Sequence, residues 1–308
     1  MNRLSGFFRK QGQLMLDQPR YALTHAVVLA VLPYTAWLSV ALIALITLRK
    51  GDAAGKKILV PALFAHFAIS LISLSPTVAT LNTLLTFVPC YLAACLLRST
   101  ASWRAVSACF FVLLVLSVLI VQYMAPNFIM AQFLFIKSVL HEAQADNAFL
   151  ELINSKAGLS SEFLANYLFG VQAAGVGLSA LLSLMLARSV QSQLYYPGGF
   201  RAEMLSFRGN RIGFLLLVIL LFTAWQGNIL AMNILPTLIL YFLLAGLSLA
   251  LTILGQRNSL GLFLLLVVPL MFIPFIMVPI YLIIGTLDSL LNFRSYLRPA
   301  AGKRTEGL

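Results

Sequence analysis

Apolar residues run through this chain in long blocks that short polar stretches separate. Roughly twenty consecutive apolar residues are enough for one helix to cross a bilayer, and a helix satisfies its own backbone hydrogen bonds in lipid. The pattern therefore predicts an all-α fold, a polytopic transmembrane helix bundle with about eight apolar blocks. These blocks are residues 21–48, 58–74, 77–97, 105–124, 163–187, 212–232, 235–254 and 260–287, with Asn233 at the turn between the sixth and the seventh.

The first and the last blocks are longer than one span needs, and both contain proline. Pro33 stands near the middle of residues 21–48, and Pro269, Pro274 and Pro279 interrupt residues 260–287. Proline removes a helical hydrogen bond and kinks or breaks a helix. We expect each end block to be broken into a hairpin or re-entrant helix, the alternative being a single kinked span. Interrupted segments in matching positions can mark a transporter's binding region, although kinks without function are common.

Two polar segments contain apolar residues at helical spacing. Residues 1–20 are basic and carry scattered leucine and phenylalanine, which predicts a short amphipathic helix at the membrane surface. In residues 125–162, Phe128, Ile129 and Phe133 recur with a period close to that of a helix. We expect an amphipathic helix near 127–154 to lie along the surface.

The distribution of charge predicts the orientation. Residues 125–162 contain four acids and two lysines, Lys137 and Lys156, which leaves 19 of the 21 lysines and arginines elsewhere. Because cytoplasmic loops carry the excess of basic residues, we expect 125–162 to be periplasmic and both termini to be cytosolic. The predicted organisation is a basic N-terminus (1–20), a single integral membrane domain (21–288) and a basic tail (289–308).

The connector between the fifth and sixth blocks, residues 188–211, is the longest polar interruption with net positive charge. A tyrosine pair beside a Pro-Gly-Gly turn suits a chain that leaves the bilayer, and clustered arginines attract anionic head groups. We expect a cytosolic loop that docks a protein partner or anionic lipid, the alternative being arginines that only fix orientation. The residues concerned are Arg188, Tyr195, Tyr196, Pro197, Gly198, Gly199, Phe200, Arg201, Arg208 and Arg211.

Composition excludes several classes of function. With 61% hydrophobic and 10% charged residues, the chain is too apolar for a soluble protein. Its net charge of +12 lies in short connectors, so we expect no nucleic-acid partner. The three cysteines have no metal-ligand spacing, and no acid lies deep in an apolar block. We therefore expect no enzyme activity, no cofactor and no metal, and any transport would draw energy from a partner or from the solute's own gradient.

Uncharged polar residues gather at the predicted outer ends of the blocks. Convergent amides and hydroxyls beside an aromatic wall would suit a neutral or weakly polar ligand, whereas interfacial loops bonding to water would have the same composition. The candidate ligand-binding residues are Ser73, Thr77, Asn82, Gln122, Trp225, Gln226, Asn228 and Asn233.

Three local patterns together carry a resemblance to a known family. They are ALITLRKG (44–51), ARSVQSQLYYPGGFRAEM (187–204) and GTLDSLLNFRSYLR (285–298). With them the chain resembles the YybS-like family of bacterial multi-pass membrane proteins, which has no assigned activity. The resemblance implies a location in the bacterial inner (cytoplasmic) membrane.

That family is distantly similar to the S components of energy-coupling-factor transporters, which implies a helical core with a ligand cavity towards the outer side. The first helix of S components often carries small residues four apart that pack on a coupling subunit, and Ala22, Ala26 and Ala30 have this spacing. Internal packing is the alternative use of the same spacing.

We expect an inner-membrane protein that binds or helps to transport a small organic or lipid-like solute. The alternative is a non-transport scaffold or assembly factor.

Overall fold

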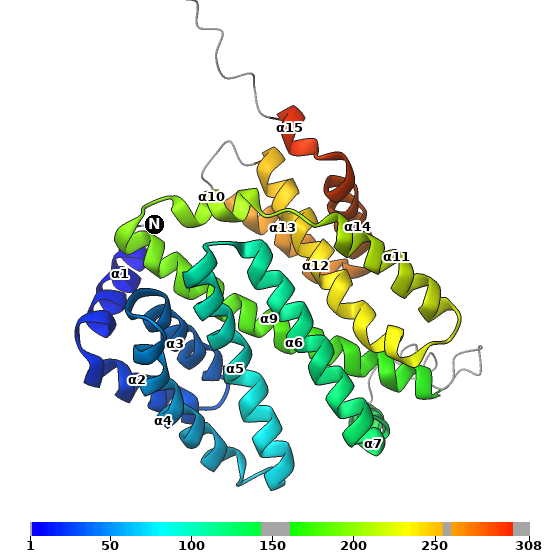
Figure 1. Cartoon of the computed structure of the whole chain (residues 1–308), viewed down its shortest axis with the longest axis horizontal. Helices are drawn as coiled ribbons and strands as arrows, with labels where there is room; N and C mark the ends of the chain where they lie inside the picture. The colour runs from blue at the N-terminus through cyan, green and yellow to red at the C-terminus, as the bar shows by residue number, and fades with distance from the viewer. Residues whose placement is uncertain (1, 143–160, 255–259, 298–308) are drawn as a thin grey trace, which may run out of the picture. The chain divides into compact units, whose positions relative to one another are not determined.

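The computed structural model describes residues 2–142, 161–254 and 260–297, and all regular elements in these ranges are helices. The predicted all-α helical bundle is confirmed. Contacts divide the chain into two compact units, Met1–Ala202 and Glu203–Leu308, which are described in turn (Figure 1). Six of the described helices are long and apolar enough to cross a membrane, as expected of a multi-pass membrane protein. They are α4 (Asp52–Ser70), α5 (Pro76–Thr100), α6 (Trp103–Met124), α9 (Ser161–Tyr195), α12 (Ile229–Leu254) and α14 (Pro274–Leu291).

The first unit is built around α3 (Ala36–Lys50), which packs against α2 (Pro19–Val31), α4, α5 and α9 (Figure 1). Every side chain of α3 from Ser39 to Leu48 is buried. The two polar ones among them donate to helix carbonyls: Ser39 to Ala26 at 2.7 Å and Thr47 to Ile43 at 2.8 Å. A helix apolar all round belongs in the core of a bundle.

The first apolar block folds back on itself as a hairpin. Along one continuous helix, Ser39 and Ala26 would stand about 20 Å apart, so their hydrogen bond requires the chain to reverse. The reversal lies between α2 and α3, where the Thr35 hydroxyl donates to the Leu29 carbonyl at 2.7 Å. Tyr34 takes the left-handed conformation there, with φ of 63°. The 13 residues of α2 extend about 20 Å, less than the thickness of a bilayer core.

Helix α7 (Pro126–Glu142) begins where the apolar spacing predicts. Its Ile129 and Phe133 are buried in a cluster with Val121 of α6 and Ala165 of α9. The second half of the helix expected near 127–154 lies outside the described residues. At the start of the chain, α1 (Asn2–Asp17) packs against α9 and α2, and its Leu16 is buried.

The connector 188–211 is mostly helical, which corrects the expectation of a loop. Helix α9 continues to Tyr195, and α10 (Gly199–Ser206) begins after a short turn. Ser192 closes this turn, since its hydroxyl donates to the Tyr196 carbonyl at 2.8 Å and accepts from the Phe200 amide at 3.0 Å. Gly198 supplies the positive φ, 89°. Near the end of α9, Arg188 donates to the side-chain oxygen of Gln191 on the same helix at 2.7 Å, and Gln191 donates to the Leu48 carbonyl of α3 at 3.4 Å.

The second unit is built around α12, which packs against α11 (Arg211–Trp225), α13 (Leu260–Phe272) and α14. The last apolar block is broken between α13 and α14, where Pro274 begins the second helix. The Tyr281 hydroxyl donates to the Leu266 carbonyl at 3.0 Å, although the two would stand about 22 Å apart along one helix. This block is therefore also a hairpin, and the predicted break of both end blocks is confirmed.

The turn between α11 and α12 lies at Gln226–Asn228, so the prediction that placed it at Asn233 is wrong. Gly227 has the positive φ that the turn needs, 81°, and the Asn228 side chain caps α12 by accepting from the Ala231 amide at 3.1 Å. Asn233 is instead fully buried within α12. The Gly227-Asn228 pair is the stronger turn signal in the sequence, because glycine adopts a positive φ without strain. Asn233 is a single polar residue with no glycine beside it.

Candidate functional site

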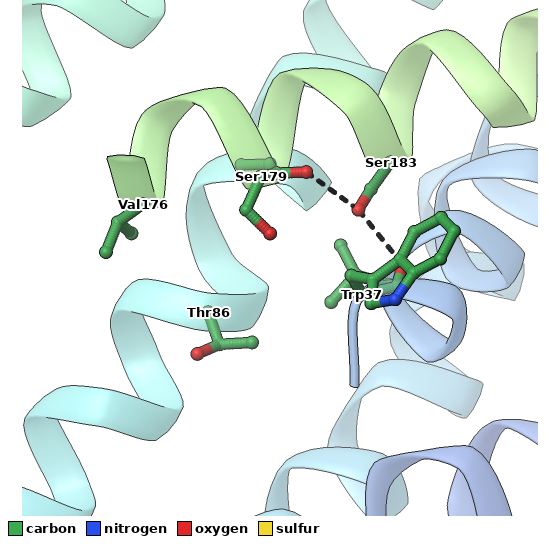
Figure 2. Close-up of a pocket in the computed structure, with 7 residues that line it drawn as sticks. Trp37, Thr86, Val176, Ser179 and Ser183 are labelled. Atoms are coloured by element: carbon green, nitrogen blue, oxygen red, sulfur yellow. Dashed lines mark hydrogen bonds between the residues drawn. The ribbon is translucent and has the colours of Figure 1, made fainter. Parts of the chain in front are cut away.

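A small hollow lies in the first unit between the start of α3, the middle of α5 and α9. It has a volume of about 80 Å³, and Trp37, near the tip of the α2–α3 hairpin, is one of its wall residues (Figure 2). We call it the α3–α5–α9 hollow. Its walls are formed by Trp37, Val40, Thr86, Val176, Ser179, Ala180 and Ser183.

Ser183 fixes one wall of the hollow. Its hydroxyl stands 2.9 Å from the Trp37 carbonyl oxygen of α3 and 2.9 Å from the Ser179 carbonyl oxygen of its own helix. The side chain is almost completely buried. The single hydroxyl proton is shared between these two carbonyl oxygens, which links α9 to the first turn of α3. Ser183 therefore positions the wall, and its hydroxyl has no further hydrogen to donate to a ligand.

The hydroxyls of Thr86 and Ser179 also belong to the walls, beside the apolar side chains. The Thr86 hydroxyl donates to the Asn82 carbonyl at 2.7 Å, so it is engaged on its own helix. The Ser179 hydroxyl points toward the space between Thr86 and Trp37 (Figure 2). Trp37, which is 41% exposed, adds an indole ring. The walls therefore combine apolar side chains with hydroxyls, which suits a weakly polar group.

The hollow lies near the middle of α5. Thr86 is about 15 Å along the helix from Pro76 at one end and about 18 Å from Arg98 at the other.

The structure does not bring the predicted ligand-binding residues into the hollow. Ser73, Thr77 and Asn82 are exposed in the first unit, and Gln122 is half-buried. In the second unit, the Trp225 side chain is 90% exposed. Gln226 and Asn228 are exposed beside it in the α11–α12 turn, and Asn233 is buried inside α12.

The small-residue stripe of α2 packs inside the first unit. Ala22, Ala26 and Ala30 are all buried by the chain itself, and α2 packs against α3 and α4. The Ala26 carbonyl accepts the Ser39 hydroxyl. The spacing thus serves internal packing, the alternative that the sequence left open.

The tyrosine pair of the connector remains near the surface of the first unit. The Arg49 guanidinium lies 3.9 Å from the centre of the Tyr195 ring, a cation–π contact. Tyr196 is 70% exposed beside Pro197, which is also exposed. The Phe200 ring meets Trp103 edge to face, and Arg201 is exposed.

In the second unit, Arg208 and Arg294 form a buried polar cluster. Arg208 donates to the carbonyls of Asp288 at 2.8 Å and Ser289 at 3.0 Å, near the end of α14. The Arg294 guanidinium pairs with the fully buried Asp288 carboxylate at 3.0 Å. It also donates to the backbone carbonyls of Leu205 and Phe207.

This cluster holds the chain that precedes α11 against α12 and α14. Burial lowers the pKa of the Arg294 guanidinium from its ordinary value, and the Asp288 carboxylate opposes that shift. The pair was not predicted from the sequence, where its signal is an acid six residues before an arginine in GTLDSLLNFRSYLR. Arg211, at the start of α11, is exposed.

Among the described side chains, no group of three or more histidines, cysteines or acids could hold a metal ion. Comparison with protein-family models, curated proteins and solved structures gave no match.

Proposed function

We propose that this membrane protein binds part of a small organic or lipid-like solute in the α3–α5–α9 hollow and helps to move it across the bacterial inner membrane. The observation that supports this function best is the position of the hollow. It lies at mid-length of α5, beside the tip of a broken helix pair. Discontinuous helices that end inside the bilayer are typical of transporter binding regions.

The conformation of the hairpin tip supports the same proposal. Tyr34 has φ of 63°, which is unfavourable for a bulky residue, and its side chain is 96% exposed. Strained residues concentrate at binding and switch regions, where they persist because their surroundings hold them. A tip strained in this way could rearrange when a solute enters or leaves the hollow.

The walls indicate the class of solute. About 80 Å³ is well below the 300–1,000 Å³ of drug-sized pockets, so the hollow would take one end of a larger molecule. Aliphatic walls, an indole and the Ser179 hydroxyl favour a chain with one weakly polar group. The lining contains no ionisable side chain, which favours an energy source outside this chain. The distant similarity of the YybS-like family, which this chain resembles, to S components favours the same class of function.

A scaffold or assembly factor without a solute is the second candidate, because the hollow is small. Mass spectrometry of the molecules that the purified protein retains distinguishes a solute-binding protein from a scaffold. The Ser179→Leu variant should lose a species that the unaltered protein retains, since the new side chain fills the hollow. Ser138→Leu, an equal change at an exposed position of α7, should retain it. Equal retention by both variants, or no retained species, would favour the scaffold.

A further inference from the structure

Basic side chains from two helices meet at the turn between α3 and α4. Arg49 and Lys50 end α3, Gly51 forms the turn, and Arg98 comes from α5. The Arg98 guanidinium carbon lies 3.6 Å from the position that a Cβ on Gly51 would take. We call Arg49, Lys50, Arg98 and Tyr195 the basic turn.

Arg98 is held in place by the end of α3. Its Nη1 group donates to the carbonyls of Leu48 at 3.0 Å and Thr47 at 3.3 Å, and Gln191 supplies a further donor to Leu48. The Thr47 carbonyl also accepts from the Gly51 amide at 3.0 Å, and the negative end of the helix dipole attracts a cation. Among the described residues, the other guanidinium nitrogens of Arg98 have no hydrogen-bond acceptor, and the residue is exposed.

Arg49 is oriented by an aromatic ring. Its guanidinium stacks over Tyr195, and the described part of the chain gives it no carboxylate partner. Tyr195 is 39% exposed and the neighbouring Tyr196 is 70% exposed. Tyrosine is enriched where acyl chains meet head groups, because its ring is apolar and its hydroxyl is polar.

The charge around the turn is strongly positive. Lys56 and Lys57 follow in the first turns of α4, and all three lysines of this region are exposed. Asp52 is the one acid between Arg49 and Lys57 in the sequence. Guanidinium groups bind phosphate oxygens through paired, charge-assisted hydrogen bonds, and an ammonium adds a point charge.

We propose that the basic turn binds the phosphate of an anionic phospholipid head group. Arg49 and Arg98 would supply oriented donors, Lys50 a further charge, and the two tyrosines would lie at the level of the head groups. A basic pocket at the end of membrane helices is the arrangement that binds such lipids. The site is separate from the α3–α5–α9 hollow, and the proposal holds whether or not a solute binds there.

The test uses the full chain purified in a neutral detergent and titrated with phosphatidylglycerol, with bound lipid counted by native mass spectrometry. The double variant Arg49→Gln, Lys50→Gln should bind phosphatidylglycerol about 25-fold more weakly than the unaltered protein. Each basic residue contributes about 1 kcal/mol, so each charge removed lowers the affinity about fivefold. Arg9→Gln, Lys10→Gln makes the same change of charge in α1 and should bind as the unaltered protein does. Arg98 is left intact, because it also holds the end of α3.

Three results would overturn the proposal. The first is equal loss of lipid by both double variants, which would indicate diffuse attraction. The second is equal protection against thermal unfolding by inorganic phosphate and by phosphatidylglycerol, which would indicate a soluble ligand. The third is unchanged lipid binding by the Arg49→Gln, Lys50→Gln variant. Thermal unfolding in phosphatidylcholine alone shows whether each variant is folded, and equal midpoints are expected.

Discussion

Gly246 of α12 and Gly285 of α14 face each other so closely that a Cβ on Gly285 would stand 2.7 Å from the Gly246 amide nitrogen. A Cβ on Gly246 would in turn overlap the Tyr281 carbonyl. The obstacles are backbone atoms, which cannot move aside as a side chain can. Small residues that allow two backbones to approach are a common basis of helix association in membranes.

We predict that Gly285→Ala destabilises the second unit by about 1–3 kcal/mol, because the added methyl group forces the two helices apart. The measurement is thermal unfolding of the purified protein in detergent. Gly261→Ala in α13 is the matched control, since a Cβ there meets nothing within 4 Å, and its midpoint should not fall. Equal midpoints for Gly285→Ala and the unaltered protein would contradict the close contact.

The Arg294–Asp288 pair gives a second prediction. Arg294→Ala should cost about 3–5 kcal/mol, because it leaves a buried carboxylate without its cation. The double variant Arg294→Ala, Asp288→Ala should be no less stable than Arg294→Ala alone, since the stranded charge is then gone. A double-mutant cycle of unfolding free energies measures this coupling, and additive losses would show that the two charges do not interact.

A third prediction concerns the cap that Arg98 forms on α3. Arg98→Ala should lower the free energy of unfolding by about 1–2 kcal/mol, because the carbonyls of Thr47 and Leu48 lose a charged donor. Arg104→Ala removes an equal charge from an exposed position at the start of α6 and should change stability little. Similar losses in both variants would point to net charge as the cause.

The conformation of Tyr34 gives a fourth prediction. Tyr34→Asn should raise stability by up to about 1 kcal/mol, because asparagine tolerates a positive φ far better than tyrosine does. The midpoint of thermal unfolding measures the gain. Val31→Asn makes a similar change of polarity at a helical position and should not stabilise. If Tyr34→Asn proves less stable than Val31→Asn, the tyrosine side chain stabilises the tip by contacts that outweigh the strain.

Much of the helical layout could be predicted from the apolar blocks, because lipid-spanning helices need long apolar runs. The breaks in both end blocks were also predictable, since Pro33 and Pro274 stand close to the two reversals. The error at Asn233 has a physical reason. The Asn233 amide is buried inside α12, whereas the glycine that the turn needs stands at Gly227, before Asn228.

The hollow could not be predicted, because its walls come from segments far apart in the chain. Ser179 and Ser183 lie within a block that has the pattern of an ordinary span, and serines in such helices usually bond to their own backbone. Their neighbour Trp37 reaches them through the fold of the α2–α3 hairpin. Likewise, the connector 188–211 is polar enough for a loop, yet most of it is helical, and Arg188 and Arg208 donate to groups on α9 and α14.

The hairpin formed by α2 and α3 is the feature on which the proposed function depends most. Single cysteines at Gln18 and Ala53, on either side of the hairpin, would be introduced into a chain whose three native cysteines are replaced. Labelling with a membrane-impermeant maleimide then reports the side of each residue. The structure predicts that both positions react from the same side of the membrane. Reaction from opposite sides would show that the first block crosses once, and the hollow would then lie beside no hairpin tip.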